Sequence, residues 1–137
     1  MGRGNTAILR GARGLTVQQE PLPGKGAVLL SLEGELDQHT FETLDQAIRE
    51  VVDGGCFRLI VDLSQVRYVS STGIGVLVGT LAEVRASQGD LVLLRPHPAV
   101  QAVLDIVGLT GEMITVAGDL ESALRAFSDK TAARPAN

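Results

Sequence analysis

The sequence predicts an α/β fold, a single domain in which a mixed, partly parallel sheet of about five strands is covered by four helices, in the order ββαβαβαβα. Short apolar runs that suit buried strands alternate with stretches whose apolar residues recur at helical spacing. Three successive strand–helix–strand units in one domain require right-handed crossovers, so part of the sheet must be parallel. The length of 137 residues fits one domain with a core of its own.

The expected strands are near-continuous apolar runs, which indicates that helices cover at least one face of the sheet. A predicted turn that contains Pro21, Pro23 and Gly24 separates the first two of them. The expected strands are residues 15–19, 27–32, 58–62, 90–94 and 113–116.

Each expected helix begins and ends at residues that suit a helix terminus. Gly54, Gly89 and Gly108 stand where the first three helices should end, and Asp119 stands where the fourth should begin. In the second helix Ile74, Leu77, Val78, Leu81 and Val84 share one face, which predicts that this helix packs on the sheet. The expected helices are residues 37–54, 70–89, 96–108 and 119–127.

The ends of the chain differ from the body in composition. Arg3, Arg10 and Arg13 stand among glycines with no acidic residue, so residues 1–13 are expected to form a flexible basic tail. Residues 14–128 are expected to form the domain, and residues 129–137 a flexible C-terminal tail. Because the formal net charge is −4 and both tails are basic, the domain itself is strongly acidic. With 3% aromatic residues and no tryptophan, it has no features of a nucleic-acid-binding surface, and no nucleic acid partner is expected.

Several other classes of site are not supported. No apolar stretch approaches 18 residues, so no membrane insertion is expected. Cys56 is the only cysteine, which favours a reducing, cytoplasmic location. With only His39 and His97 besides it, no paired ligand spacing exists, and we expect no metal, no cofactor and no catalytic residue.

The most unusual stretch is the hydroxyl–glycine segment, in which Ser70, Ser71 and Thr72 precede Gly73 and Gly75. A helix needs one capping hydroxyl, and each glycine in its first turns costs about 1 kcal/mol relative to alanine. Two explanations of the segment stay open. One is capping combined with tight helix–sheet packing, and the other is a functional site. The segment also resembles a dinucleotide fingerprint, but Val78 stands where that motif requires glycine.

Acidic residues gather around the end of the second expected strand and the first expected helix. Such a charge run is usually a solvated face, but it also suits a surface that steers a basic partner, and both interpretations stay open. These residues are Glu33, Glu35, Asp37, Glu42, Asp45, Glu50 and Asp53.

Four motifs in order resemble bacterial anti-sigma factor antagonists, the single-domain members of the STAS family. The resemblance extends from about Leu15 to Phe127. The motifs are Gly34-Glu35-Leu36-Asp37 with Thr40, Leu59-Ile60-Val61-Asp62-Leu63-Ser64 with Val66, Ser71-Thr72-Gly73-Ile74-Gly75-Val76-Leu77, and Val107-Gly108-Leu109.

The resemblance implies a small cytosolic regulator and no enzyme. Such proteins bind an anti-sigma factor that is also a serine kinase and thereby free a sigma factor, while phosphorylation of a serine switches binding off and a serine phosphatase resets it. The family pattern Asp-Ser-Ser-Gly places Ser71 at the phosphorylated serine, with Ser70 in place of the acid and with Ser70 and Thr72 as rival targets. The implied partner-binding residues are Glu35, Asp37, Thr40, Ser70, Ser71, Thr72, Gly73, Ile74 and Gly75.

Two alternatives stay open. The chain also suits a constitutive accessory STAS subunit of a lipid transporter or of a stress-signalling complex, in which no phosphorylation occurs. A small nucleotide-binding enzyme is the third interpretation. Phosphorylation by a kinase partner would favour the antagonist. Stable binding without phosphorylation would favour the accessory subunit, and nucleotide turnover would favour the enzyme.

Overall fold

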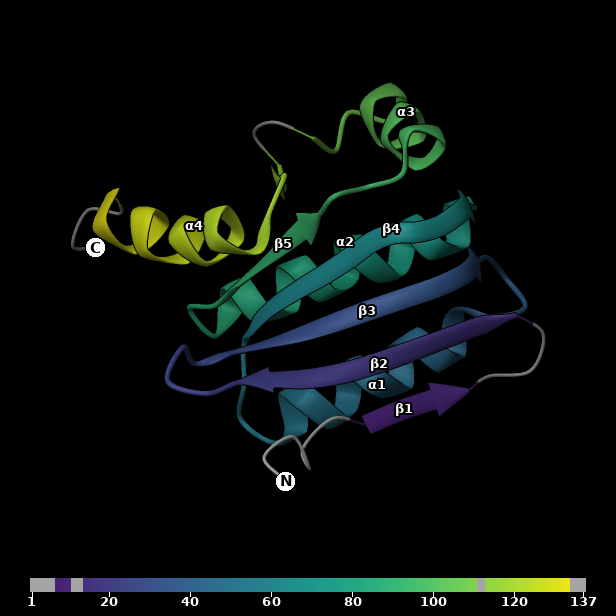
Figure 1. The fold of residues 1–137 in the computed structure, drawn as a ribbon. Coiled ribbons are helices and arrows are strands. Elements are labelled where there is room, and N and C mark those ends of the chain that lie inside the picture. Colours follow the sequence, from purple (N-terminus) through teal and green to yellow (C-terminus); the bar gives the residue numbers. More distant parts are fainter. Residues whose placement is uncertain (1–6, 11–13, 111–112, 134–137) are drawn as a thin grey trace.

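The computed structural model describes residues 7–10, 14–110 and 113–133 (Figure 1). Within them, one sheet has the spatial order β1-β2-β3-β4-β5-β6. The first two pairings, β1–β2 and β2–β3, are antiparallel, and the other three are parallel. The elements are β1 (Ala7–Arg10), β2 (Leu15–Leu22), β3 (Ala27–Leu36), α1 (Phe41–Asp53), β4 (Arg58–Val69), α2 (Ser71–Ala86), β5 (Asp90–Leu94), α3 (Pro98–Ile106), β6 (Thr115–Ala117) and α4 (Leu120–Ala133).

The predicted mixed α/β sheet and its four helices are confirmed, but some residues that were expected in each tail belong to a strand or a helix. Ala7–Arg10 form a sixth strand, β1, in which Ala7 pairs with Gln19 and Arg10 with Thr16. Helix α4 continues to Ala133, beyond the expected end of the domain at residue 128. A four-residue strand is held by pairing with a neighbour rather than by its own sequence, so its composition alone indicated a tail.

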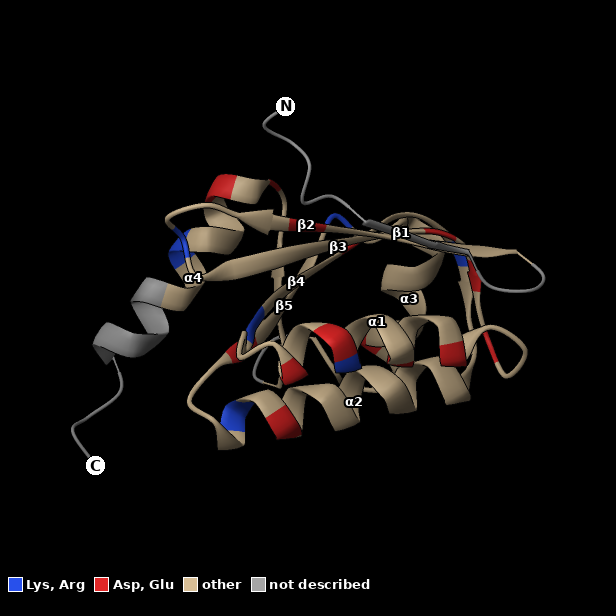
Figure 2. Ribbon diagram, turned by 90° about the horizontal axis from the view of Figure 1, so that it is seen from below, with Lys and Arg blue, Asp and Glu red and all other residues tan. Residues whose placement is uncertain are grey.

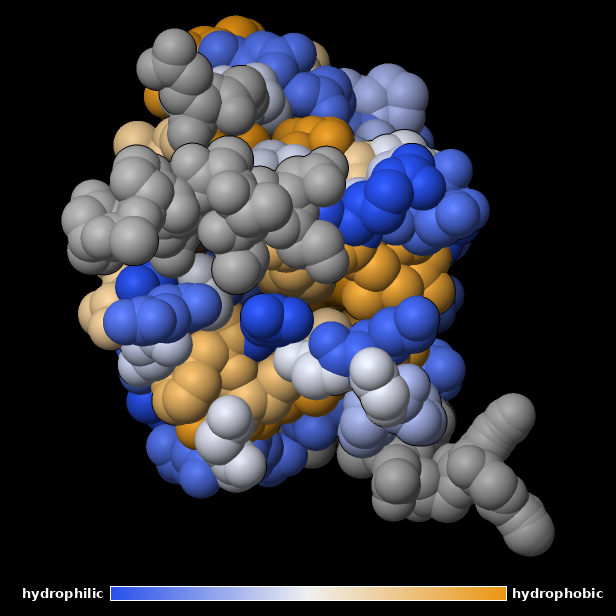
Figure 3. Space-filling view, turned by 90° about the vertical axis from the view of Figure 1, so that its left-hand side faces the viewer, coloured by the Kyte–Doolittle hydropathy of each residue, from blue (hydrophilic) through white to orange (hydrophobic). Residues whose placement is uncertain are grey.

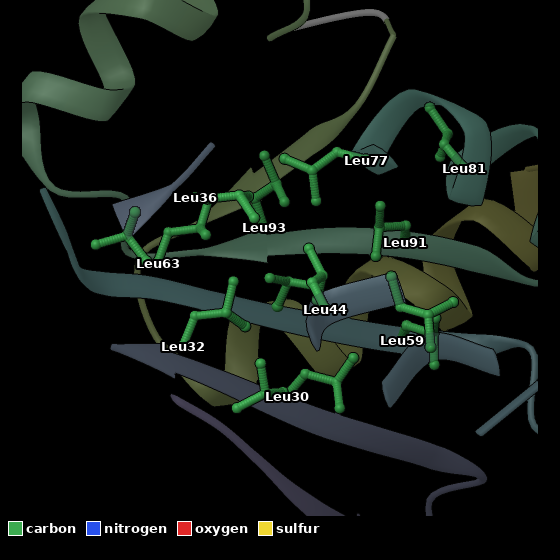
Figure 4. Packing of buried hydrophobic residues seen from close by; sticks show 14 of the residues in the cluster. Leu30, Leu32, Leu36, Leu44, Leu59, Leu63, Leu77, Leu81, Leu91 and Leu93 are labelled. Carbon is green, nitrogen blue, oxygen red and sulfur yellow. The ribbon is translucent and has the colours of Figure 1, made fainter. Parts of the chain in front are cut away.

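The helices form two layers on the sheet, as Figures 1 and 2 show. Helices α1 and α2 cover one face, where buried leucines of β3, β4 and β5 meet Leu44 of α1 and Leu77 and Leu81 of α2 (Figure 4). Helix α4 covers part of the other face, where Ala123 and Phe127 pack in a smaller cluster with Ile60. The predicted packing of α2 on the sheet is therefore confirmed.

Strands β3 and β4 extend beyond the rest of the sheet. Strand β5 pairs with β4 only over Arg58–Asp62, whereas β3 accompanies β4 as far as Val69. The extension of β4 does not alternate strictly between buried and exposed residues, because pairs of less buried residues separate Leu63, Val66 and Val69, and its pairing with β3 contains two register shifts. This irregular, polar pattern did not predict a strand. The extended ends place the start of α2 at the margin of the sheet. No helix in the described part of the chain has the length and apolarity to cross a membrane.

Candidate partner-binding site

Ser70 joins the start of α2 to the sheet. Its backbone N–H donates to the carbonyl of Leu36 at the end of β3, at 2.9 Å. Its side chain is the N-cap of α2, because Oγ accepts a hydrogen bond of 3.4 Å from the N–H of Gly73. Serine and aspartate are both strong N-caps, so Ser70 fills the capping role without the charge that an aspartate would bring.

Gly73 is required by the packing of this helix end. The residue is buried, and a Cβ atom there would lie 2.7 Å from Cγ of Leu36 and 2.9 Å from the Leu36 carbonyl oxygen. Both distances are too short for a methyl group, so only glycine lets α2 approach the end of β3 this closely. The packing explanation of the glycine is therefore correct at this position.

Ser71 and Gly75 lie on the opposite, solvent-facing side of the same turn. Both residues are exposed, and a Cβ atom at Gly75 would meet no atom within 4 Å. Thr72 and Ile74 flank them and are half-buried. Because the first N–H groups of a helix have no intrahelical acceptor and carry the positive end of the helix dipole, an added negative charge at Ser71 is compatible with the fold.

The loop between β3 and α1 brings the predicted residues Glu35, Asp37 and Thr40 to the same end of the sheet. Thr40 is 2% exposed, and its Oγ1 donates to the carbonyl of Glu35 at 2.7 Å and accepts from the N–H of Asp37 at 3.0 Å. Asp37 is half-buried and accepts a hydrogen bond of 2.8 Å from the N–H of His39. The structure therefore places Thr40 beneath the surface, where it holds the loop.

Glu35 differs from these two residues because it is exposed. It lines a shallow hollow of about 230 Å³ together with Glu33, Gln65 and Arg67. Arg67 offsets part of the acidic charge there. Of the two acids predicted to contact a partner, Glu35 is exposed to solvent. Asp37 is half-buried, and its carboxylate accepts a hydrogen bond within the loop.

Tyr68 is a surface residue of this region that the sequence analysis did not single out. It stands opposite Glu35 in the β3–β4 ladder, directly before Val69 and Ser70, and is 52% exposed. Exposed tyrosines are enriched among the residues that dominate binding at protein interfaces. An aromatic residue two positions before the hydroxyl–glycine segment is the signal in the sequence that would have found it.

Asp62 and Ser64, the polar residues of the second motif, have a structural role. Asp62 is 8% exposed and lies on the face away from α2, because Val61 and Leu63 on either side enter the core beneath α1 and α2. Burial alone would raise the pKa of Asp62, but hydrogen bonds from the Ser64 N–H at 2.9 Å and from Arg95 at 2.7 Å outweigh it and lower the pKa. This motif therefore stabilises the end of β4 and β5.

The two histidines and the carboxylates form no separate site. His97 caps α3, its Nδ1 accepting a hydrogen bond of 3.1 Å from the N–H of Ala99, and His39 is exposed in the β3–α1 loop. In residues 14–110 and 113–127, whose side chains are described, no three His, Cys, Asp or Glu residues are placed to hold a metal ion.

Comparisons with known proteins agree with this geometry. A curated relative, named as the anti-sigma factor antagonist BtrV of Bordetella bronchiseptica, is 34% identical over 102 residues, which are 74% of this chain and 87% of the relative. An anti-sigma factor antagonist from Mycobacterium paratuberculosis has a crystal structure that is 28% identical, covers 88% of this chain and 100% of that one, and superposes with a TM-score of 0.75.

A third comparison concerns a protein solved in a modified state. The Bacillus cell fate determinant SpoIIAA in its phosphorylated form is 28% identical, covers 80% of this chain and 98% of that one, and superposes with a TM-score of 0.62. The sequence model of the STAS domain matches residues 20–123, most of the described chain. The chain therefore belongs to the STAS domain family, and the relatives from Bordetella bronchiseptica and Mycobacterium paratuberculosis are named anti-sigma factor antagonists.

Proposed function

We propose that this chain is a cytoplasmic anti-sigma factor antagonist whose partner is an anti-sigma factor with serine kinase activity. The observation that supports the proposal is that neighbouring residues at the start of α2 have different structural roles. Ser70 and Gly73 hold the helix on the sheet, whereas Ser71 and Gly75 face solvent and have no role in the packing. The names of the relatives and the phosphorylated form of SpoIIAA support it.

Phosphorylation of Ser71 acts as the switch in this proposal. A phosphate adds a charge of about −1.5 to −2, which the N-terminus of α2 tolerates. A partner surface pressed against Ser71 does not tolerate it, because an unpaired charge removed from water in an interface costs roughly 2–5 kcal/mol. Since each 1.4 kcal/mol is a tenfold change in affinity, phosphorylation releases the kinase almost completely, and a serine phosphatase restores binding.

The surface around Ser71 suits a protein partner. Gly75 carries no side chain that would separate the two surfaces, and Tyr68 offers an exposed aromatic ring at the end of β4. Glu35 supplies an accessible negative charge, so a partner with lysine or arginine opposite it would associate faster. Replacing Glu35 by lysine should slow association at low salt and weaken its salt dependence.

The deciding experiment combines the purified chain with the candidate anti-sigma kinase of the same genome and ATP, followed by mapping of the phosphate. Ser71→Ala should bind the kinase and accept no phosphate, whereas Ser71→Asp should bind more weakly with an unchanged melting temperature. Ser87 provides a matched control because it is an exposed serine at the other end of α2. Ser87→Asp should leave binding unchanged.

Other outcomes would redirect or overturn the proposal. Phosphate on Ser70 or Thr72 would move the target by one residue. Stable binding without phosphorylation would favour the second candidate, a constitutive accessory STAS subunit of a transporter or stress-signalling complex. The observation in favour of that candidate is Ser70, which stands where the family's acid is expected. Absence of binding to the kinase would remove the support for an antagonist.

A further inference from the structure

A second region of interest lies at the opposite end of β4 from Ser71. A hollow of about 410 Å³ opens between the β2–β3 turn, the first residue of β4 and helix α4. Lys25 comes from the turn, Arg58 from β4 and Arg125 from α4. Figure 2 shows blue positions on α4 and the neighbouring turn at one end of the molecule, and Figure 3 views this end directly.

The cations of this hollow are unusual in an acidic protein. Elsewhere Arg49, Arg85 and Arg95 each lie within 4.0 Å of a carboxylate oxygen. Across residues 14–110 and 113–127, by contrast, Lys25, Arg58 and Arg67 form no ion pair. Arg67 stands beside Glu33 and Glu35, whereas Lys25 and Arg58 share one hollow, and two such cations together, unpaired among these residues, favour an anion from solution.

Arg58 is positioned to present its N–H groups. Its guanidinium carbon lies over the Phe127 ring, 5.8 Å from the centroid, a cation–π contact that holds the side chain at the hollow. The planar set of N–H donors on a guanidinium matches the oxygens of a phosphate.

The third cation, Arg125, forms a weak ion pair with an exposed carboxylate. Arg125 lies 3.3 Å from Glu121, and the two side chains are 61% and 82% exposed. Exposed pairs of this kind contribute little to stability, so Arg125 can exchange Glu121 for another anion. Leu124, which is half-buried, and Phe127, which is 4% exposed, complete the lining of a mainly polar hollow.

We propose that this hollow binds a small organic phosphate. The phosphate lies between Lys25 and Arg58, and the organic group rests against Leu124. A volume of a few hundred Å³ is typical of small-molecule sites, and a small number of converging polar groups fixes the ligand in them. The proposal is independent of the Ser71 switch because it uses no residue of that region.

The test uses the full chain at low ionic strength, with inorganic phosphate and phenyl phosphate titrated by calorimetry and by NMR. Saturable binding is expected, tighter for phenyl phosphate because its ring contacts Leu124. Lys25→Gln and Arg58→Gln should each weaken binding about tenfold. Glu121→Gln should tighten it, because Arg125 is then free. Arg67→Gln is the matched control, an exposed arginine outside the hollow whose replacement should change nothing.

Each other result overturns the proposal. If Arg67→Gln weakens binding as much as Lys25→Gln, phosphate responds only to net charge. If no saturation occurs with either probe, the hollow is not a phosphate site. Lys25 is in an exposed turn, so Lys25→Gln is expected to fold even if Arg58→Gln does not. Binding to phosphatidylserine vesicles that depends on Lys25, without binding of phenyl phosphate, would assign the hollow to a membrane headgroup. Ser71→Asp should not affect any of these measurements.

Discussion

The two sides of the α2 N-terminus contain the same kinds of residue but have different structural roles. On the inner side, Ser70 caps the helix and Gly73 lets it approach Leu36. On the outer side, Ser71 and Gly75 contact nothing that the fold requires. Residues whose identity the packing explains are poor candidates for function, and residues of the same type without such an explanation are good ones.

Helical geometry produces this division. Residues three or four apart lie on one face of a helix, so Ser70 and Gly73 turn toward the sheet while Ser71 and Gly75 turn away from it. A comparison of the two sides can therefore be made within a single turn, by replacing one residue on each side and measuring stability and partner binding separately.

The largest expected effect comes from charging the buried face of α2. Leu77 is 1% exposed in the core between α2 and the sheet. Leu77→Asp should abolish the cooperative thermal transition, because an unpaired buried carboxylate costs several kcal/mol, comparable to about 5–15 kcal/mol for the whole domain. Ala82→Asp, on the exposed face of the same helix, is the control and should melt near the unmodified protein. An unchanged melting temperature for Leu77→Asp would contradict the packing of α2.

The two glycines should respond to alanine with opposite signs. Gly73→Ala should lower the free energy of unfolding by about 1–3 kcal/mol, because the new methyl group overlaps Leu36. Gly75→Ala should raise it by up to about 1 kcal/mol, because alanine favours the helix and has open space there. Urea denaturation of both variants measures the difference. If both are destabilised alike, the two sides of the turn are not distinct.

These pairs also show what the sequence could predict. Periodicity was sufficient for the order of the elements after β1 and for the buried positions Leu77, Leu81 and Val84, because burial recurs with the helical repeat. The hydroxyl–glycine segment was recognised, but its inner and outer residues could not be told apart without the crossing of α2 over β3.

Other features depended on contacts between distant segments. Strand β1 exists through pairing with β2, and the loop around Thr40 turns that hydroxyl inward to Glu35 rather than into α1. The exposure of Tyr68 follows register shifts between β3 and β4 that break the alternation of buried and exposed residues. Local sequence patterns do not determine the pairing of β1 with β2, the hydrogen bond of Thr40 or the register of β3 and β4.

A smaller effect is expected from the hydroxyls. Ser70→Ala removes the cap of α2 and should lower the free energy of unfolding by roughly 0.5–1 kcal/mol, near the lower end for a cap because the hydrogen bond is 3.4 Å long. Ser71→Ala should leave stability unchanged within error. Thermal melts of the two single variants provide the measurement. Equal losses would mean that Ser71 also supports the helix and that its exposure is not evidence for function.

The smallest effect concerns Asp62, a residue of the second motif that faces away from α2. Its lowered pKa means that it contributes stability above about pH 3.9, the ordinary value of an unfolded aspartate, and that this contribution is lost as the pH falls through the lowered value. Arg95→Gln should reduce stability at pH 7 by a few tenths of a kcal/mol to about 1 kcal/mol, since Arg95 is half exposed.

The pH dependence is the stricter test of this role. The difference in unfolding free energy between the unmodified protein and Arg95→Gln should persist from pH 7 to about pH 5 and shrink as the pH falls below about 4, because protonated Asp62 no longer attracts the guanidinium. In an Asp62→Asn background, Arg95→Gln should have the same effect at every pH. A difference that grows on acidification would contradict the sign of the pKa shift. Binding of the kinase should be the same for Arg95→Gln as for the unmodified protein, because a residue that serves the packing of β4 and β5 lies outside the surface around Ser71.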